Sequence, residues 1–504
     1  MKNILLFGAG KSATVLIDYL IEHAEKEQWR LTVVDADIVL AKSKIGNSSY
    51  AIAVSFDIND AGLREKYISE SDIVISLLPP SLHTIAALSC IELNKNLLTA
   101  SYIDPEIKKL EDKILNKKLL FLCEMGLDPG IDHMSAMKLF DKIRNDGGRI
   151  TSFKSHCGGL IVPESDNNPW HYKISWNPRN ILLAGKSGAH YLENGKEIKL
   201  SYEELFSPGR DVNIQGAGRL SWYPNRDSLS YATLYGLEQA ETLIRTTLRH
   251  PDFMMGWHDV IRYKLTDEAV KYSGKGKMLA DFFEEHLKVN NLSKIFEEEI
   301  GNFFELTASI GKELELVLKN TIIYDKEREK VIETILTTND PGDIESFDLG
   351  EKANEVKTLF HNFNKKCLPI IQLSYLGFIT GSESIPLNSY SAADVTQLAL
   401  ESKLALQPED KDMIVMFHEI EYADRENRKL KIESSLVVKG QDSVRTAMAK
   451  TVGLPLGIAA KLILNGTIKL TGLHIPTPAE IYLPVLAELK KNGIIFHEES
   501  KFLS

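Results

Sequence analysis

Residues 1–13 read MKNILLFGAGKSA and decide how the N-terminal part of this 504-residue chain folds. The apolar run Ile4–Phe7 predicts a buried strand, and the residues after it fit the pattern Gly-x-Gly-x-x-Ala. In this pattern Gly8 permits a tight turn, Gly10 lets the backbone approach a pyrophosphate, and the small Ala13 allows close packing of helix on strand. The segment therefore predicts a dinucleotide-binding loop of the Rossmann type. A structural glycine turn in another α/β protein is the alternative.

The residues that follow repeat an alternation of strand and helix. Further short apolar runs predict strands at Leu31–Val34, Ala51–Phe56, Asp72–Leu77, Asn96–Thr99 and Leu119–Cys123. Helical patterns lie between most of them, for example at Ser12–Lys26 and Leu82–Leu93. Short apolar strands separated by helices are typical of a parallel sheet that is buried on both faces. We therefore expect a Rossmann parallel sheet in about the first 126 residues.

The pattern changes after Gly126. Strands and loops rich in Gly, Pro and Asn are expected from Ile150 to about Tyr223, and helices from about Tyr231 to Gln407. A hairpin is then predicted around the turn ADREN, with strands at Asp412–Glu421 and Leu430–Val438. The chain closes with predicted helices at Ser443–Leu464 and Ala479–Lys491 and the strand-like segment GIIFHE.

Composition and charge exclude several classes of protein. Hydrophobic residues make up 43% and charged residues 26%, as in ordinary globular proteins, and the net charge of -11 argues against a nucleic-acid or anionic-membrane surface. The 4 cysteines (Cys90, Cys123, Cys157 and Cys367) show no CxxC or metal-ligand spacing. Together with an N-terminus unlike a signal peptide and no apolar run of about 20 residues, this predicts a metal-free cytoplasmic protein.

Asp35 bears on the choice of cofactor. It ends the second predicted strand, 25 residues after Gly10. A carboxylate there can bind both ribose hydroxyls of NAD but would repel a 2′-phosphate, and no arginine stands beside it in VVDADI. We therefore expect NAD to be preferred, with NADP possible. A surface aspartate at a strand end is the alternative.

Three further segments contain candidate substrate-binding or catalytic residues. TASY (Thr99–Tyr102) ends the fifth strand, at the carboxyl edge where open α/β sheets bind ligands. GLDPGIDH (Gly126–His133) ends the sixth strand and starts a helix, and YPNRDS (Tyr223–Ser228) holds Arg226 in a turn. Each segment alone also fits a simpler interpretation: a strand end, a Pro-Gly turn with Asp132 as a helix cap, and a surface arginine.

Together these segments resemble saccharopine dehydrogenases of the glutamate-forming type, and especially the second half of bifunctional animal aminoadipate semialdehyde synthase. The resemblance also takes in SLLPPSLH, CGGLIVPESDNNPWHYKISW, TLRH, and MAKTVGLPLGIAAKLILNG followed by KNGIIF. It covers essentially the whole chain and is least distinctive at about 260–400. Where the family usually reads CGGLPAPE, this chain has Ile161 and Val162, a local change that we expect to leave the chemistry unaltered.

The resemblance implies oxidation of saccharopine with NAD(P) and water to glutamate and 2-aminoadipate 6-semialdehyde in lysine metabolism. It implies an α/β fold with an N-terminal Rossmann parallel sheet, a mixed α/β substrate domain and an all-helical insertion. The Rossmann domain is expected at 1–128, joined by a returning helix at about 443–478, and the insertion at about 231–404. The substrate domain is expected at 129–230 with about 405–442 and 479–504.

The resemblance also implies the roles of individual residues. Saccharopine carries three carboxylates, so cationic side chains should line its cleft. Arg226 is the first candidate, followed by Arg249 in TLRH and Lys173 in HYKISW. Ser101, Tyr102 and Asp128 are expected close to the reacting amine. The remaining cofactor contacts are expected at Lys11, Ser12, Asp57, Leu77, Leu127 and Pro129.

Catalytic roles are expected for Asp128, Tyr102 and Cys157. Cys157 could help to hold a water, and a buried structural thiol is the alternative. His133 is expected to pack in the first turn of its helix. No metal is required, because the cofactor carries the redox chemistry.

Two other functions stay open at this point. One is a related imine or amine dehydrogenase of the kind that makes carboxylated polyamines, and the other is a catalytically silent nucleotide-binding regulator. The expected partner is a small molecule with several carboxylates, without nucleic acid or membrane. A homodimer and a lysine-ketoglutarate reductase partner are open alternatives.

Overall fold

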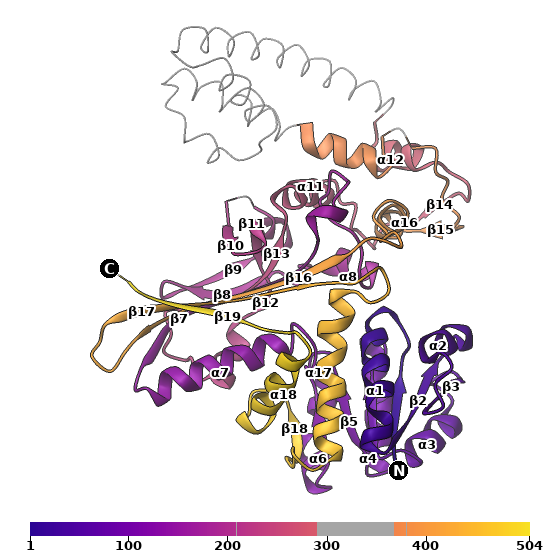
Figure 1. Cartoon of the computed structure of the whole chain (residues 1–504). Coiled ribbons are helices and arrows are strands. Elements are labelled where there is room, and N and C mark those ends of the chain that lie inside the picture. The colour runs from indigo at the N-terminus through magenta and orange to yellow at the C-terminus, as the bar shows by residue number, and fades with distance from the viewer. Residues whose placement is uncertain (208, 290–366, 380, 504) are drawn as a thin grey trace. The chain divides into compact units, whose positions relative to one another are not determined.

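The computed structural model describes residues 1–207, 209–289, 367–379 and 381–503 (Figure 1). The chain forms two compact units. The first comprises Met1–Asp166, Tyr172–His250 and Ala405–Ser504, and the second comprises Asn167–His171 and Pro251–Leu404. Every site residue expected from the sequence belongs to the first unit.

A seven-stranded parallel sheet forms the N-terminal part of the first unit, with strand order β18-β6-β5-β4-β1-β2-β3. Its strands are β1 (Lys2–Phe7), β2 (Trp29–Asp35), β3 (Ala51–Ser55), β4 (Ile73–Ser76), β5 (Asn96–Thr99), β6 (Leu120–Leu122) and β18 (Gly472–His474). Its helices are η1 (Lys11–Ala13), α1 (Thr14–Glu27), α2 (Ile38–Ile45), α3 (Ala61–Ser69), η2 (Pro80–Leu82), α4 (His83–Glu92), α5 (Pro105–Lys108) and α6 (Glu111–Asn116). The expected Rossmann sheet is confirmed.

Strand β1 shows why the sheet is apolar on both faces. Ile4 and Leu6 pack into one hydrophobic core, whereas Leu5 and Phe7 pack into a second core on the other face. Successive side chains of a strand point to opposite faces, so a strand covered by helices on both sides needs apolar residues at every position. The short apolar runs of the sequence are explained by this burial.

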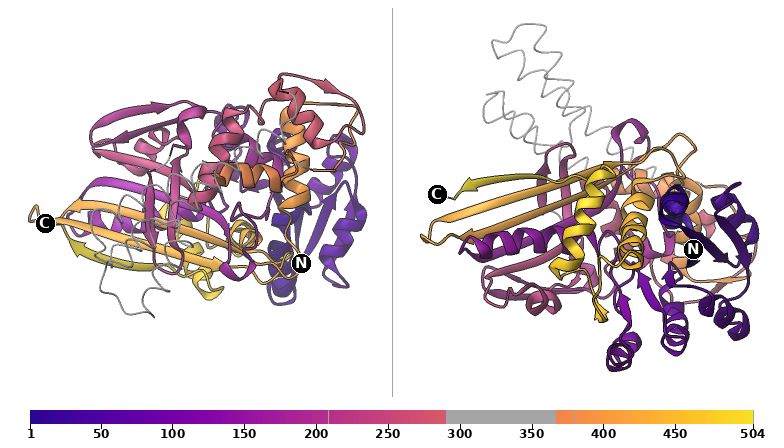
Figure 2. Two further views of the ribbon diagram at one scale, coloured as in Figure 1. Left: turned by 90° about the horizontal axis from the view of Figure 1, so that it is seen from above. Right: turned by 60° about the horizontal axis from the view of Figure 1, so that its bottom comes forward.

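Helix α17 (Ala447–Leu464) returns from the C-terminal part of the chain to the Rossmann sheet, where it packs against α1 (Figures 1 and 2). The helix begins at Ala447 rather than at the expected Ser443, because Thr446 caps it by accepting the backbone N–H of Ala449. By length and composition alone α17 could cross a membrane, but 61% of it is buried inside the protein. Its apolar character is that of a core helix.

A ten-stranded mixed sheet forms the rest of the first unit, with the main order β10-β11-β13-β7-β16-β17-β19. The strands are β7 (Arg149–Ile161), β8 (Ala189–Glu193), β9 (Lys196–Leu200), β10 (Asp211–Ile214), β11 (Gly218–Pro224), β12 (Arg226–Asp227), β13 (Thr242–Arg249), β16 (Asp412–Ala423), β17 (Lys429–Lys439) and β19 (His497–Phe502). The hairpin expected near residue 412 is β16 with β17. On its other side β16 pairs with β7, and β17 pairs with β19 (Figures 1 and 2).

Helix α7 (Ile131–Asn145) packs on one face of the mixed sheet, beside α18 (Ala479–Lys491) (Figure 1). The unit also contains η3 (Pro163–Ser165), α8 (Pro178–Leu183), α9 (Tyr202–Leu205), η4 (Leu229–Tyr231) and α10 (Ala232–Tyr235). Because α7 is the next helix after β6, the GLDPGIDH segment between them links the carboxyl edge of the Rossmann sheet to the mixed sheet.

The structure corrects two expectations at segment boundaries. Residues 242–249, expected at the start of the helical region, form β13 in the mixed sheet, which suits their β-branched sequence TLIRTTLR. The last strand starts at His497 rather than at Gly493, because Gly493 takes a left-handed φ of 78° just after α18.

The second unit contains α11 (Pro251–Arg262), α12 (Leu279–Leu287) and α16 (Ala392–Lys403). It also contains a two-stranded pair, β14 (Tyr272–Ser273) and β15 (Ser389–Tyr390), so its described part is not wholly helical as expected. Residues 290–366 of the expected helical insertion lie outside the described residues.

Candidate functional site

The glycine loop after β1 has the geometry that a dinucleotide needs. Gly8 has a φ of 98°, and a Cβ at this position would lie 2.7 Å from the carbonyl oxygen of Leu77, so only glycine fits. At Gly10 a Cβ would meet nothing within 4 Å, so the space above the loop is open. Helix η1 begins directly after Gly10, and its first backbone N–H groups are available to a phosphate.

Asp35 at the end of β2 braces this loop. Its Oδ2 accepts a hydrogen bond from the backbone N–H of Ala9 at 2.7 Å, and its Oδ1 accepts one from Asp37 at 2.9 Å. The open space over Gly10 and a carboxylate on the neighbouring strand together fit a nicotinamide dinucleotide. When bound, such a cofactor would be held by the Gly8–Ala13 loop and by Asp35.

Some of the other residues expected to contact the cofactor lie at or next to this loop. Lys11 and Ser12 open η1, and Leu77 follows β4 and donates its backbone N–H to Phe7. Asp57 follows β3, the edge strand beside β2. Leu127 and Pro129 are buried in the turn before α7. Their contacts with a cofactor stay predictions.

The GLDPGIDH turn is a tight structure that only glycine permits at its end. The backbone N–H of Gly126 donates to the carbonyl oxygen of Pro129 at 3.0 Å, across a cis Asp128–Pro129 peptide bond. Gly130 has a φ of 147°, and a Cβ there would lie 2.1 Å from the carbonyl oxygen of Gly126. Asp132 accepts the N–H of Gly130 at 2.6 Å, as the capping interpretation proposed, but it also has a second role.

That second role is an ion pair with a buried arginine. Nη2 of Arg245, on β13, lies 2.5 Å from Oδ1 of Asp128 and 2.7 Å from Oδ2 of Asp132. The three side chains are 5%, 13% and 1% exposed, respectively. One guanidinium group therefore holds two carboxylates at the start of α7, and Asp128 is the more accessible of them.

Aromatic rings hold the guanidinium groups in line. The guanidinium carbon of Arg245 lies 4.4 Å from the ring centre of Tyr231 and 6.0 Å from that of Tyr102. Arg226 lies 4.7 Å from the ring centre of Tyr102. The order Arg226, Tyr102, Arg245, Tyr231 thus alternates cations and rings, an arrangement in which the ring quadrupoles stabilise the charges.

The backbone of β13 positions Arg226. The N–H of Asn225 donates to the carbonyl oxygen of Arg245 at 2.8 Å, and the N–H of Arg245 donates to Oγ of Ser228 at 3.0 Å. Arg226 itself adopts a left-handed φ of 53°, is exposed, and forms no ion pair with any residue that the structure describes. Its guanidinium group is therefore available to an external carboxylate.

Ser101 is held by a buried histidine. Nε2 of His83 lies 2.8 Å from Oγ of Ser101, and its Nδ1 lies 2.8 Å from Oγ of Ser76. Burial lowers the pKa of His83 to about 4, so the imidazole is neutral near pH 7. This chain of hydrogen bonds fixes the Ser101 hydroxyl at the carboxyl edge of the Rossmann sheet.

His133 packs in the first turn of α7, as expected, and joins a buried network. Its Nε2 lies 2.8 Å from Oε2 of Glu124, and its Nδ1 lies 2.6 Å from the hydroxyl of Tyr235. The Tyr231 hydroxyl donates to Oε2 of Glu124 at 3.2 Å. Glu124 also accepts the backbone N–H of Ile103, so it ties the TASY segment to α7 and to the Tyr231 ring.

The remaining substrate candidates have internal contacts. Nζ of Lys173 lies 2.7 Å from Oδ2 of Asp410, and both side chains are largely buried. The buried Arg249 lies over the ring of Tyr172 at 5.4 Å. A substrate carboxylate would have to share Lys173 with Asp410, which makes Arg226 the freer of these cations. The roles of Lys173 and Arg249 stay predictions.

Cys157 lies on the same face of the mixed sheet as Arg245. It pairs with Thr247 of β13, and Arg245 and Thr247 are two residues apart, so their side chains share a face. Burial raises the pKa of the Cys157 thiol well above its ordinary value, so the thiol is neutral. A neutral thiol suits packing or a weak hydrogen bond to water rather than nucleophilic attack.

The two carboxylates of the pair differ electrostatically. Burial raises the pKa of Asp128 to about 6, with Arg245 opposing the change. Burial alone would also raise the pKa of Asp132, but the interactions with His133 and Arg245 outweigh it and lower the pKa of that carboxyl group. Asp132 is therefore the permanent anion, and Asp128 is the group that can exchange a proton near neutral pH.

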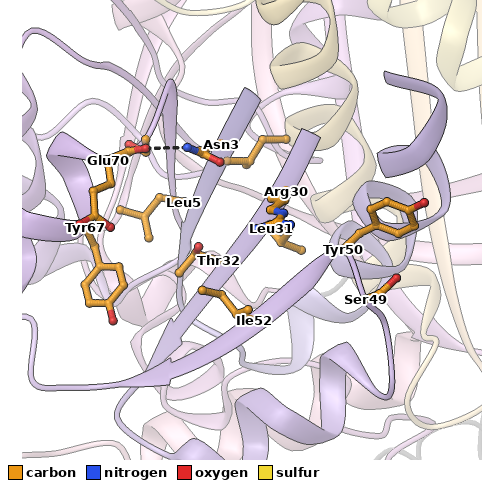
Figure 3. Close-up of a pocket in the computed structure, with 12 residues that line it drawn as sticks. Asn3, Leu5, Arg30, Leu31, Thr32, Ser49, Tyr50, Ile52, Tyr67 and Glu70 are labelled. Atoms are coloured by element: carbon orange, nitrogen blue, oxygen red, sulfur yellow. Dashed lines mark hydrogen bonds between the residues drawn. The ribbon is translucent and has the colours of Figure 1, made fainter. Parts of the chain in front are cut away.

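A separate hollow of about 280 Å³ lies at the amino ends of β1, β2 and β3, the edge opposite the glycine loop (Figure 3). Leu5, Thr32 and Ile52 stand at the same register on these strands and line it from one face. The side-chain amide of Asn3 donates to the carbonyl oxygen of Glu70 at 2.9 Å across its end. Its position excludes it as the cofactor site.

Sequence reasoning missed Arg245 and Tyr231, whereas it did single out Tyr102, the other ring over the Arg245 guanidinium group. The available signal is an arginine inside the β-branched run TLIRTT, four residues before Arg249 and hence on the same face of the strand. A charged residue in the middle of a buried strand is rare unless it is paired.

Two family models match the chain in succession. The saccharopine dehydrogenase NADP binding domain matches residues 4–122, and the saccharopine dehydrogenase C-terminal domain matches residues 126–494. The chain belongs to the saccharopine dehydrogenase family. It is therefore an oxidoreductase with a nicotinamide-dinucleotide-binding domain at its N-terminal end.

Relatives of two lengths match over nearly the whole chain. Saccharopine dehydrogenase [NADP(+), L-glutamate-forming] of Saccharomyces cerevisiae is 32% identical, with 99% of each chain covered. The α-aminoadipic semialdehyde synthase of Arabidopsis thaliana is also 32% identical over 99% of this chain, but the chain spans only 45% of that protein. Partnership with a lysine-ketoglutarate reductase stays a prediction.

The fold agrees with a solved structure of the same family. The apo histidine-tagged saccharopine dehydrogenase (L-Glu forming) from Saccharomyces cerevisiae superposes with a TM-score of 0.77 at 27% identity, covering 99% of this chain and all of that one. The expected fold class, with a Rossmann sheet and a mixed-sheet domain, is confirmed.

Proposed function

We propose that the chain oxidises saccharopine with a nicotinamide cofactor and water, giving glutamate and 2-aminoadipate 6-semialdehyde. One observation carries the proposal: Tyr102, Asp128 and Arg226, from three separate segments, gather around Arg245 where the Rossmann sheet meets the mixed sheet. Membership of the saccharopine dehydrogenase family supports the same substrate.

The charges of the site suit a substrate with several carboxylates. Arg226 is an exposed guanidinium group without an ion-pair partner among the described residues, and its rigid fork matches a carboxylate. Ser101 offers a hydroxyl fixed by His83. Asp128 offers a partly accessible carboxylate, which attracts the positively charged secondary amine of saccharopine.

The chemistry requires the substrate amine to lose a proton before it reacts. Asp128, with a pKa raised to about 6 by burial, can accept this proton and later return it. A bound nicotinamide cofactor would supply the acceptor for the hydride that leaves the carbon next to the nitrogen. Water then attacks the substrate imine, and Asp128 and the Ser101 hydroxyl can orient that water before the carbon–nitrogen bond breaks.

Two observations bear on the choice of cofactor, and they favour different answers. The matching family model and the yeast relative carry NADP in their names. In this chain, however, Asp35 ends β2 with its carboxylate at the cofactor loop, where it would repel a 2′-phosphate. We propose that NAD is preferred, because the local charge acts directly on the group that distinguishes the two cofactors.

A direct assay tests the proposed function. Purified protein is mixed with saccharopine and NAD or NADP, and formation of the reduced cofactor is followed by absorbance. We expect reduction that depends on both protein and saccharopine. Reduction with carboxylated polyamines but not with saccharopine would instead identify the related amine dehydrogenase, and no reduction with either would contradict an enzymatic role.

A further inference from the structure

We propose that Arg245 is a positioning residue that keeps Asp132 as a permanent anion and leaves Asp128 to exchange a proton with the substrate amine. The proposal rests on the proposed oxidation of saccharopine and adds a residue that acts through Asp128 without touching the substrate. It assigns different roles to the two carboxylates of the GLDPGIDH segment, Asp128 and Asp132.

The geometry makes Arg245 the link between the carboxylates. A single nitrogen, Nη2, lies within 2.5 Å of Asp128 and 2.7 Å of Asp132, so one positive charge serves two negative ones. Two carboxylates buried this closely cannot both stay charged without a cation beside them. The rings of Tyr231 and Tyr102 lie over the guanidinium group and limit its rotation away from the pair.

The surroundings divide the duties between the two carboxylates. Asp132 is 1% exposed, accepts the N–H of Gly130 at 2.6 Å, and stands in the first turn of α7, where the helix dipole favours an anion. His133 lies 3.7 Å from its Oδ2. Asp128 is 13% exposed and lies before the helix, so it has fewer donors and better access to a substrate.

Charged and titratable groups face Asp128 from every element packed around it. They are Arg245 on β13, Asp132 and His133 on α7, Arg226 on β12, Tyr235 on α10, Tyr102 after β5 and Cys157 on β7. Arg245 is the cation in direct contact. Its removal should therefore change the proton affinity of Asp128 more than any other single substitution.

The proton transfer itself is simple. Saccharopine binds with a protonated secondary amine, and the N–H bond breaks as an oxygen of Asp128 takes the proton. The amine becomes neutral and Asp128 becomes a neutral carboxylic acid, so charge is conserved. Arg245 remains paired with Asp132 throughout. The guanidinium group therefore keeps its position when Asp128 gives up the proton and becomes charged again.

Two substitutions with opposite expected effects test the proposal. Asp128 must be ionised to act, so kcat/KM of the wild type should fall as the pH drops through about 6. Arg245→Met removes the cation, so this acidic limb should move up by roughly 1 pH unit or more. Asp132→Asn keeps the acceptor oxygen but removes the competing anion, so the limb should move down. Arg245→Lys, which keeps the charge, should shift the limb less than Arg245→Met.

A general loss of stability cannot shift the acidic limb of the pH profile in opposite directions in Arg245→Met and Asp132→Asn. If both variants lose activity while the acidic limb stays in place, Arg245 is merely structural and the proposal is overturned. If Arg245→Met does not fold, Asp132→Asn decides alone, because an unmoved or upward-moved limb in that variant also overturns the proposal.

A second measurement separates this proposal from the proposed function. The infrared carboxyl band of Asp128, identified by its loss in Asp128→Asn, can be titrated without any substrate. The same opposite shifts of its midpoint are expected. If the wild type fails to oxidise saccharopine while the band still shifts as described, the substrate assignment is wrong and the role of Arg245 stands. Unmoved midpoints contradict the role of Arg245 regardless of the substrate.

Discussion

The guanidinium group of Arg226 lies over the ring of Tyr102, with 4.7 Å between the guanidinium carbon and the ring centre. Arg226 is exposed, so burial does not fix its side chain. Because no carboxylate of the described residues pairs with it, the ring is its main support. Tyr102 can therefore act through its ring as well as through its hydroxyl.

Substitutions at Tyr102 separate these two actions. Tyr102→Phe keeps the ring and should leave KM for saccharopine close to the wild-type value. Tyr102→Leu removes a cation–π contact worth about 0.5–2 kcal/mol, so KM should rise about 2- to 30-fold. Arg226→Ala removes the guanidinium group itself and should have the larger effect on substrate binding. We expect a loss of about 2–5 kcal/mol in saccharopine binding and an unchanged cofactor affinity. A large fall in kcat for Tyr102→Phe would instead assign catalysis to the hydroxyl.

Two glycine substitutions test the cofactor loop. Gly10→Ala adds a Cβ that meets nothing within 4 Å, so the variant should fold with the wild-type melting temperature but bind the cofactor more weakly. Gly8→Ala is the matched comparison, because its Cβ would lie 2.7 Å from the backbone of Leu77 and the φ of 98° is strained. It should lower the melting temperature. Full cofactor affinity in Gly10→Ala would place the pyrophosphate elsewhere.

Cofactor preference tests the role of Asp35. We expect kcat/KM to be higher with NAD than with NADP, and Asp35→Ala to narrow this ratio because it removes the charge that repels a 2′-phosphate. Asp35→Ala also removes the hydrogen bond from Ala9, so a melting curve must show that the loop still folds. A wild-type enzyme about 10-fold better with NADP, a difference of about 1.4 kcal/mol, would contradict this role.

Asp128→Asn tests charge rather than shape. Asparagine keeps the size of the side chain and one acceptor oxygen, so the variant should fold and bind the cofactor. It cannot accept the amine proton, and kcat should fall about 100-fold or more. Steady-state kinetics together with a cofactor titration would check both expectations. Near-wild-type turnover would transfer the proton-accepting role to Tyr102 or to a water held near Cys157.

Much of the fold could be predicted because its signals are local. The strand β1, the glycine loop and the helix α1 follow one another in 27 residues, and each has its own pattern of apolar residues or glycines. The strand β18 was missed, since its three residues Gly472–His474 carry no periodicity. It pairs with β6, a strand far away in the sequence, so only the tertiary structure shows its place.

The site could be predicted only where a motif marked it. Tyr102, Asp128 and Arg226 stand in conspicuous segments, and the structure brings them together. Arg245 could not be assigned, because its partner Asp128 lies 117 residues away and their contact depends on how β13 pairs with β7. The pairing of Lys173 with Asp410 is equally a product of tertiary structure.

Product analysis tests the central claim most directly. Saccharopine and the preferred cofactor are incubated with the protein, and amino acids are quantified together with the reduced cofactor. We expect one glutamate to be released for each cofactor reduced, with a semialdehyde as the second product. Release of lysine and 2-oxoglutarate, or reduced cofactor without glutamate, would contradict the proposed reaction.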